Sequence, residues 1–203
     1  MSILVFGFEP FLEYDENPTE IMVKSLEGRS FGGDLVTAAV LPVDYRRIDE
    51  VITRAVAKAK PTLVIGFGLA AGREKITPEK IAVNYRHAEK ADNAGRKVHG
   101  SPIDPKGPDG LFSNLPVEGL VASLNRRGIP ASLSLSAGSF LCNAAMYVTV
   151  REAKEKGFRG GFVHVPCHSE WIARKKKATP SLPLDTLLTA AQHSVEYCAS
   201  HKV

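Results

Sequence analysis

Short apolar runs that alternate with amphipathic helical segments are the feature that most constrains the fold of this chain. Runs with the length and composition of buried strands occupy residues 3–8, 35–40, 63–67, 131–136 and 161–165. Between two of them, Ile48, Ile52 and Val56 recur at helical spacing ahead of Pro61. Such alternation favours a parallel or mixed sheet with helices on both faces. We therefore predict an α/β fold, a three-layer α/β/α sandwich with a mixed, mostly parallel central sheet.

Helix start and stop signals delimit the segments between these strands. Asn17 and Pro18 provide a cap and a first-turn proline, and Gly28 and Gly157 follow two of the helical patterns. Helices are predicted over about residues 18–27, 48–59, 116–127, 142–156 and 183–200.

Three segments have weaker patterns. Residues 76–84 mix apolar and polar positions and are expected to form an extended arm or a hairpin. Residues 85–114 are rich in Gly, Pro, Asp and Lys, and a loop of this length is usually functional. The basic run from Arg174 to Lys177 has no interleaved aromatic residues, so we expect a solvated loop rather than a nucleic-acid site.

Composition indicates an ordinary globular protein. The 203 residues are 44% hydrophobic and 24% charged, which suits a single domain of ordinary size over residues 1–203. No apolar stretch approaches the roughly 18 residues of a membrane helix, and no charged leader precedes the first strand. Three widely spaced cysteines suit a reducing compartment, and a net charge of +4 is too small to indicate nucleic acid. We predict a cytoplasmic location without membrane or nucleic-acid partners.

Cys142 is a candidate nucleophile. It follows residues 136–141, which connect a predicted strand to a predicted helix, so its thiol is expected in the first turn of that helix. Unpaired amides and the positive end of the helix dipole favour a thiolate there and lower the pKa of the thiol. The same amides can hold an oxyanion. The competing interpretation is a buried cysteine with no chemical role, because free cysteines are common in cores.

His164 and Glu79 are candidate partners for this thiol. His164 lies near the carboxyl end of a predicted strand, at the sheet edge where active sites gather. A cysteine and a histidine within reach make a nucleophile with its general base, and a carboxylate then orients the imidazole. Glu79, beside an apolar run, is one such carboxylate. A core histidine and a solvated acid remain the alternative interpretation.

A metal site competes with this interpretation. His164, Cys167 and His168 lie within five positions and are zinc-type ligands. Pro166 makes a helical histidine pair improbable, and no second ligand pair with finger-like spacing occurs. We therefore predict no metal.

A dinucleotide site also competes, because residues 66–71 fit the loose pattern G-x-G-x-x-A after a predicted strand. Such a loop should open a long helix, yet the chain reaches Pro78 without a helical apolar stripe. The favoured interpretation is a glycine-rich turn that allows close backbone approach.

Several motifs in order resemble the pyroglutamyl peptidase I family, the pyrrolidone carboxyl peptidases. The resemblance spans nearly the whole chain and rests on Gly7-Phe8-Glu9-Pro10-Phe11, Asn17-Pro18-Thr19, Leu41-Pro42-Val43, residues 79–84, Ser136-Ala137-Gly138, Leu141-Cys142-Asn143 and His164-Val165-Pro166. It implies a cytosolic cysteine peptidase, commonly a homotetramer, that acts on peptides or proteins with N-terminal pyroglutamate through a thioester and needs no cofactor.

The resemblance also implies roles for individual residues. Cys142 would be the nucleophile, His164 the general base and Glu79 the carboxylate that orients the histidine. The family's apolar slot for the lactam ring would be formed by Phe8, Phe11, Phe140 and Leu141. Pyroglutamate has no charged amino group, so an apolar slot accepts it and excludes a charged N-terminus.

Two positions depart from the family pattern. Glu89-Lys90 stands where the family usually has an arginine followed by an apolar residue, and Arg86 or Lys90 is expected to supply the missing charge. Leu12 stands where the family often has glycine, beside the lactam slot. The alternative function is therefore a divergent member with lost or altered activity.

Overall fold

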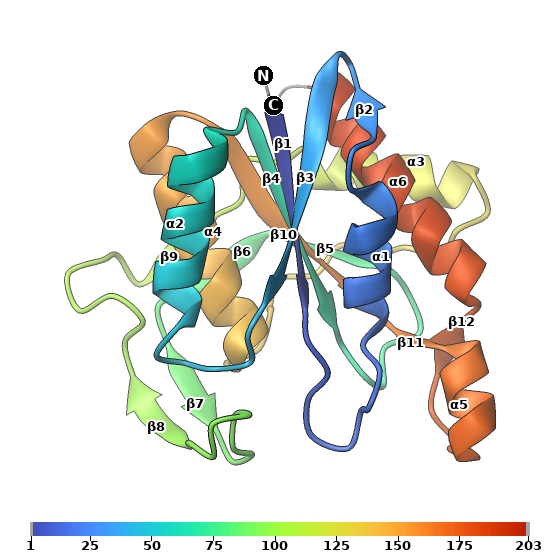
Figure 1. Cartoon of the computed structure of the whole chain (residues 1–203), viewed down its shortest axis with the longest axis horizontal. Coiled ribbons are helices and arrows are strands. Elements are labelled where there is room, and N and C mark those ends of the chain that lie inside the picture. Colours follow the sequence, from blue (N-terminus) through green and yellow to red (C-terminus); the bar gives the residue numbers. More distant parts are fainter. Residues whose placement is uncertain (1, 202–203) are drawn as a thin grey trace.

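A central sheet between two layers of helices forms the body of the chain in the computed structural model, which describes residues 2–201 (Figure 1). In spatial order its strands are β2 (Ser30–Phe31), β3 (Asp34–Leu41), β1 (Ser2–Phe8), β4 (Leu63–Leu69), β10 (Arg159–Val165) and β5 (Thr77–Glu79). The inner strands run parallel, whereas the edge strands β2 and β5 are antiparallel to their neighbours. The predicted mixed, mostly parallel sheet is confirmed.

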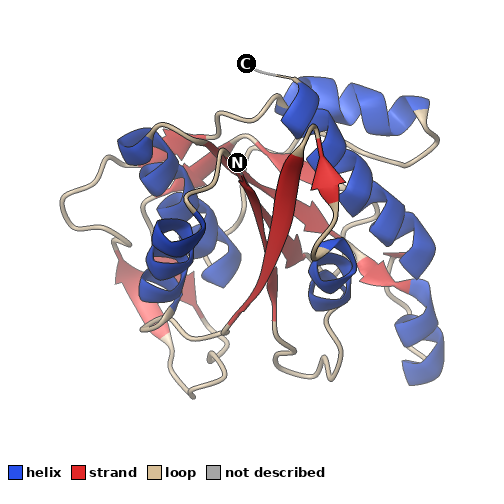
Figure 2. Cartoon of the chain, turned by 45° about the horizontal axis from the view of Figure 1, so that its top comes forward, coloured by secondary structure: helices blue, strands red, loops and turns tan. Residues whose placement is uncertain are grey.

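Helices cover both faces of this sheet (Figures 1 and 2). One face carries α2 (Ile48–Ala59) and α4 (Leu141–Lys156), and the other carries α1 (Pro18–Leu26), α3 (Val117–Arg126) and α6 (Leu184–Ser200). The predicted three-layer sandwich is therefore confirmed. No helix within residues 2–201 combines the length and the apolar character needed to cross a membrane.

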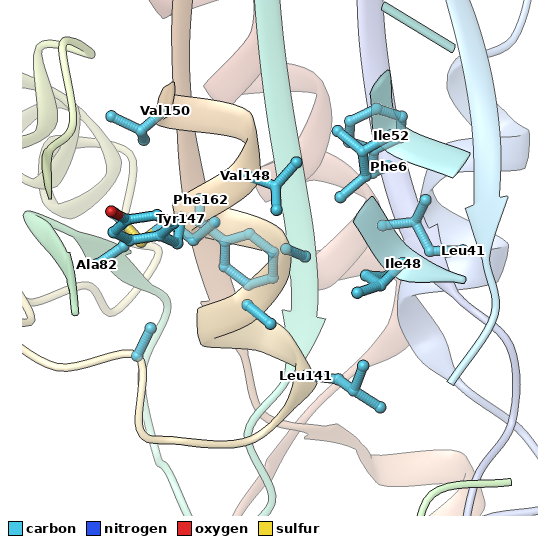
Figure 3. Close-up of a cluster of buried hydrophobic side chains, with 14 of the residues drawn as sticks. Phe6, Leu41, Ile48, Ile52, Ala82, Leu141, Tyr147, Val148, Val150 and Phe162 are labelled. Carbon is cyan, nitrogen blue, oxygen red and sulfur yellow. The ribbon is translucent and has the colours of Figure 1, made fainter. Parts of the chain in front are cut away.

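The two cores explain why β1 from Ile3 onward and the whole of β4 are apolar. In β1, Ile3 and Val5 pack with α1, α3 and α6, while Leu4 and Phe6 pack with α2 and α4. Figure 3 shows part of the second core, where Phe6 lies beside Ile52 between the sheet and α2. Because both faces of these two strands are buried, successive residues are apolar side chains or glycine.

Side chains at the start of α1 hold this helix against β1. The side chain of Asn17 caps the helix by accepting the Thr19 amide at 3.1 Å, and the Thr19 hydroxyl accepts the Phe8 amide at 3.0 Å. Gly7 permits this approach, because a Cβ on Gly7 would overlap the backbone carbonyl of Thr19. The contact fixes the start of the loop between β1 and α1.

The predicted strand over residues 131–136 is confirmed only in part. Parallel bridges join Ala131 to Ile76 and Ser134 to Glu79, and the Ser132 and Ser134 amides donate to the carbonyls of Ile76 and Pro78 at 3.0 Å each. Pro78 has no N–H to donate between these bridges, so the pairing is not a continuous ladder. Leu133 and Leu135 are 40% and 68% exposed, so burial of these side chains does not stabilise the segment.

The segments on either side of residue 84 form short strands. Residues 76–84 are extended, as predicted, and the predicted loop over residues 85–114 contains a hairpin and one further strand. The pairs are β6 (Ile81–Val83) with β9 (Gly110–Phe112) and β7 (Arg86–Ala88) with β8 (Val98–Ser101).

Two polar side chains order this long segment. Asn84 donates to the carbonyls of Asp104 and Gly107 at 2.7 and 3.2 Å and accepts the amide of Asp104 at 2.8 Å. Asp92 accepts the backbone amides of Tyr45 and Arg96 at 3.1 and 2.8 Å. Hydrogen bonds to the backbone therefore order this region together with the few apolar side chains that reach the core, among them Ala88 and Leu111.

The basic run near the C-terminus is not simply a solvated loop. Arg174 and Lys175 end α5 (Ser169–Lys175) and form ion pairs of 2.6 Å with Glu16 and Asp15. The helix follows β11 (Cys167–His168), which pairs with β12 (Ser181–Leu182). These ion pairs connect α5 to the loop between β1 and α1.

We predict that Gly7→Ala will lower the free energy of unfolding by about 1–3 kcal/mol, because the added methyl group forces α1 away from β1. Urea unfolding followed by circular dichroism measures this change. Gly110→Ala is the matched control, since its Cβ would first meet the flexible Ile81 side chain at 3.2 Å. Equal losses in the two variants would contradict the explanation.

Candidate active site

A cavity of about 600 Å³ opens where β4 and β10 end, at the carboxyl edge of the parallel strands. Cys142 and His164 both line it. Cys142 is the second residue of α4, which confirms its predicted place in the first turn of a helix, and His164 lies near the end of β10. The volume is within the roughly 300–1,000 Å³ typical of small-molecule sites.

Glycine in β4 makes room for the thiol. Gly68 pairs with His164 across β4 and β10, and a Cβ on Gly68 would lie 2.9 Å from the Cys142 sulfur and 2.7 Å from the Phe162 ring. Gly66 faces the same ring. Both glycines lie inside a strand, so the predicted glycine-rich turn is wrong, and their role is to admit side chains from α4 and β10.

A buried hydrogen bond joins Glu79 to His164. The Nδ1 atom of His164 lies 2.7 Å from Oε1 of Glu79, and the two residues are 3% and 0% exposed. A carboxylate only accepts, so Nδ1 carries the proton and Nε2 is left to accept one. Glu79 comes from edge strand β5, whose antiparallel pairing with β10 brings the two side chains together.

Arg73 is a part of the site that the sequence interpretation does not include. Its guanidinium donates to Oε1 of Glu79 at 2.7 Å, to the carbonyl of Ser136 at 2.9 Å and also to the hydroxyl of Thr77. Arg73 also lines the cavity. In the sequence it is one basic residue between two predicted strands, with no motif of its own to distinguish it.

Glu79 and His164 shift each other's pKa values, and the charge of Arg73 acts on both. Burial favours a raised pKa for Glu79, but the hydrogen bond and charge of His164, together with the charge of Arg73, outweigh it and hold the pKa below its ordinary value. Burial lowers the pKa of His164, although its hydrogen bond with Glu79 acts in the opposite direction. An ionised Glu79 and a neutral His164 are therefore favoured.

The predicted lowering of the thiol pKa is wrong. Burial, together with the charge of Glu79, raises the pKa of the Cys142 thiol to about 12, against the opposing effect of Arg73. A thiolate loses its solvation when it is buried, and the partial charge of a helix start does not compensate for that loss here. The resting pair is therefore a neutral thiol beside a neutral imidazole.

The side chains predicted for the lactam slot meet in one narrow cavity beside the thiol. Its walls include Phe8, Phe11, Phe140, Leu141 and Cys142. Its other wall residues, which the sequence interpretation does not assign, are Asn17, Val43 and Leu69. Asn17 and Val43 lie in two of the motifs that carry the family resemblance. Their position in those motifs could have identified them as wall residues from the sequence alone.

Both departures from the family pattern border the site. Leu12 and Lys90 line the cavity that contains Cys142. Arg86 instead bonds through Nε to the hydroxyl of Ser101 at 2.9 Å, on the β7–β8 hairpin. Of the two cations expected to replace the missing arginine, Lys90 is the one in the cavity wall.

The zinc-type residues do not form a metal site. His168 lies against carboxylates, with nitrogens 2.6 Å from Glu16 and 3.2 Å from Glu170. Across residues 2–201, no group of three or more His, Cys, Asp or Glu side chains is arranged to hold a metal ion.

Comparison with known proteins agrees with this fold and site. The family model described as pyroglutamyl peptidase matches residues 1–201. The chain is 50% identical to pyrrolidone-carboxylate peptidase 1 of Saccharolobus solfataricus, over 100% of this chain and 96% of the relative. It is 40% identical to the pyrrolidone-carboxylate peptidase of Pyrococcus furiosus, over 97% of each chain.

Solved structures of the Pyrococcus furiosus pyrrolidone carboxyl peptidase have the same fold. One of them superposes with a TM-score of 0.95 at 39% identity and covers 98% of this chain and 99% of its own. This protein is therefore a peptidase, a hydrolase of the cysteine type. It belongs to the pyroglutamyl peptidase family.

We predict that alkylation of Cys142 by iodoacetamide will accelerate by about tenfold per pH unit between about pH 6 and pH 9, without a plateau, because the thiolate fraction rises below a raised pKa. Mass spectrometry of the Cys142 peptide measures the rate. The Cys142→Ser variant controls for the buried Cys167 and Cys198. A plateau near neutral pH would instead show a resting thiolate–imidazolium pair.

Proposed function

We propose that this protein hydrolyses the amide bond after an N-terminal pyroglutamyl residue, with Cys142 as nucleophile, His164 as general base and Glu79 as the carboxylate that orients the imidazole. The observation that carries this proposal is the 2.7 Å hydrogen bond from His164 to Glu79, at a cavity that His164 shares with Cys142. Family membership supports it. The Nδ1 contact directs the unprotonated Nε2 away from Glu79, as a general base requires.

The narrow apolar cavity is proposed to hold the lactam ring. Phe8, Phe11, Phe140 and Leu141 line it together with Cys142. The uncharged lactam, once its N–H and C=O find backbone hydrogen-bond partners, is much less costly to bury than the ammonium of an ordinary N-terminus. The slot thereby selects pyroglutamate and places its carbonyl carbon at the thiol.

The first half of the reaction is attack by sulfur. His164 Nε2 accepts the thiol proton as the Cys142 sulfur bonds to the carbonyl carbon, and backbone amides at the start of α4 stabilise the oxyanion. The imidazolium then protonates the leaving amine as the carbon–nitrogen bond breaks, which leaves a pyroglutamyl thioester. Because burial raises the pKa of the thiol, proton transfer accompanies attack.

The second half is hydrolysis of the thioester. His164 accepts a proton from water as the water oxygen attacks the same carbonyl, and it returns the proton to the departing sulfur. Pyroglutamate is released and the enzyme returns to its starting state. Every proton in this cycle is carried by His164, so the mechanism needs no metal or organic cofactor.

Arg73 is proposed to assist this cycle through its contact with Glu79. Its contact with Oε1 of Glu79 favours the ionised carboxylate, which must accept from His164 Nδ1 throughout the reaction. The same guanidinium bonds to the carbonyl of Ser136, so it also holds the segment that leads to Cys142.

A second candidate function is a divergent member with lost or altered activity. The observation that favours it is the position of Glu89, which lines a cavity beside the site where the family usually has arginine. Lys90 lines the catalytic cavity and supplies a positive charge there, so we favour the active enzyme.

Assembly and location follow from the family resemblance. We propose a cytoplasmic homotetramer, and size-exclusion chromatography with light scattering tests its mass.

We predict that the native protein will release a fluorescent amine from a pyroglutamyl amide under reducing conditions and that Cys142→Ser will lower kcat by at least about 10³-fold, because the hydroxyl is a far weaker nucleophile here. Fluorescence measures the rate, and thermal unfolding of both proteins confirms folding. Cys167→Ser, which changes another thiol, is the matched control. A folded native protein without turnover would favour the divergent member, and Glu89→Arg would then be the variant to assay.

We predict that Glu79→Gln will lower kcat by about 10²- to 10⁴-fold, because an amide neither stabilises the imidazolium nor enforces the Nδ1-protonated tautomer. Glu118→Gln is the matched control: Glu118 lies on α3 and forms an ion pair with Lys80, so the same chemical change there should leave kcat unchanged. Unchanged kinetics in Glu79→Gln would show that another group orients His164.

A further inference from the structure

A second, smaller cavity lies against the catalytic one. It has a volume of about 220 Å³, compared with about 600 Å³ for the cavity that contains Cys142. Four residues line both cavities: Phe11, Leu12, Lys90 and Phe140. The smaller cavity is therefore a side pocket of the catalytic cavity, of a size for one side chain rather than a separate ligand.

Leu12 forms part of this wall in a strained conformation. Its φ is 54°, and the turn is closed by the Tyr14 amide, which donates to the Phe11 carbonyl at 3.0 Å. Glycine is the usual residue with positive φ at the first central position of such a turn. Leu12 is 43% exposed and adopts this strained backbone conformation at the rim of the catalytic cavity. Backbone strain of this kind clusters at functional sites, so it indicates a functional role for Leu12.

The other walls of the side pocket are mainly apolar. The Phe11 and Phe140 rings lie with centroids 6.2 Å apart, and Ala88 contributes a methyl group. His87 contributes an imidazole, and Glu89 and Lys90 bring one charge of each sign. Because the two opposite charges are adjacent in the sequence, the pocket has no excess charge from them, and its apolar wall favours an apolar side chain.

The position of the pocket relative to the thiol identifies its occupant. Phe11 and Phe140 also line the lactam slot, on the same side as Cys142. A pyroglutamyl group in that slot directs the rest of the peptide into the larger cavity, past the same two rings. The side chain nearest to them belongs to the residue that follows pyroglutamate.

We propose that the side pocket is a binding site for this second residue and that Leu12 makes it selective for a large apolar side chain, as in pyroglutamyl-leucine and pyroglutamyl-phenylalanine sequences. The inference rests on the proposed function and adds a substrate class to it. A side chain that fills the pocket removes the exposed Leu12 surface from water, and this gain persists in the transition state.

The test compares pyroglutamyl-leucinamide, pyroglutamyl-phenylalaninamide and pyroglutamyl-alaninamide, with the released amino-acid amide measured by mass spectrometry. In the native protein, kcat/KM for the leucine and phenylalanine substrates should exceed that for alanine by at least about tenfold. Leu12→Gly should lower this preference several-fold. Leu12→Asn, a residue that tolerates positive φ, should lower it as well while keeping the turn.

Leu35→Gly is the matched control. Leu35 is a leucine with 54% exposure on β3, paired with Ser2 at the opposite end of the sheet from the cavity. Its removal should leave the preference unchanged, and thermal unfolding checks that each variant is folded.

The outcomes separate the two proposals. Release of all three amides with equal kcat/KM, or a preference that survives in both Leu12 variants, overturns the side-pocket assignment and leaves the proposed function standing. A folded native protein that releases none of the three overturns the proposed function, and the side-pocket assignment with it.

Discussion

Glu79 is a carboxylate without exposed surface, and the arrangement of the site depends on how its charge is paired. An isolated buried carboxylate would take up a proton, so this charge requires nearby donors. His164 and Arg73 supply them at 2.7 Å each, from β10 and from the loop after β4. Because Arg73 also bonds to the Ser136 carbonyl, the same group positions the segment that leads to Cys142. The imidazole, the carboxylate and the guanidinium are thus held as one hydrogen-bonded unit, and Cys142 lines the same cavity as His164.

Close packing positions the thiol in the cavity that His164 also lines. Phe162 fills the space that Gly66 and Gly68 leave above β4, and the sulfur of Cys142 lies against the same strand. This packing also buries the sulfur, which raises the pKa of the thiol despite its place at a helix start. The site therefore suits a general-base mechanism, in which His164 removes the proton during attack, better than one with a preformed thiolate.

The loops around the cavity are held both by polar contacts and by apolar packing, since Phe11 and Tyr14 pack against the cluster that contains Trp171. The loop after β1, which carries Phe11 and Leu12, is tied to α5 by Asp15, which accepts the Trp171 indole N–H at 2.7 Å. The segment that carries Lys90 is ordered by hydrogen bonds to Asp92. These contacts hold the walls of the proposed lactam slot and side pocket near the thiol. In the proposed function, loop side chains therefore select the substrate, while the sheet positions His164 and Glu79.

Sequence patterns alone are enough to predict the layers of the fold and the residues that are candidates for catalysis. Burial of both strand faces requires continuous apolar runs, and Cys142 at a helix start and His164 near a strand end are local features that periodicity reveals. The family resemblance implies that Glu79 orients His164, but the contact between them, the participation of Arg73 and the direction of the thiol pKa follow from the tertiary structure. Those properties depend on the β5–β10 register and on burial, which join residues about 85 positions apart. The interrupted strand over residues 131–136 also depends on tertiary context, because its partner segment places Pro78, which has no N–H, between the two bridges.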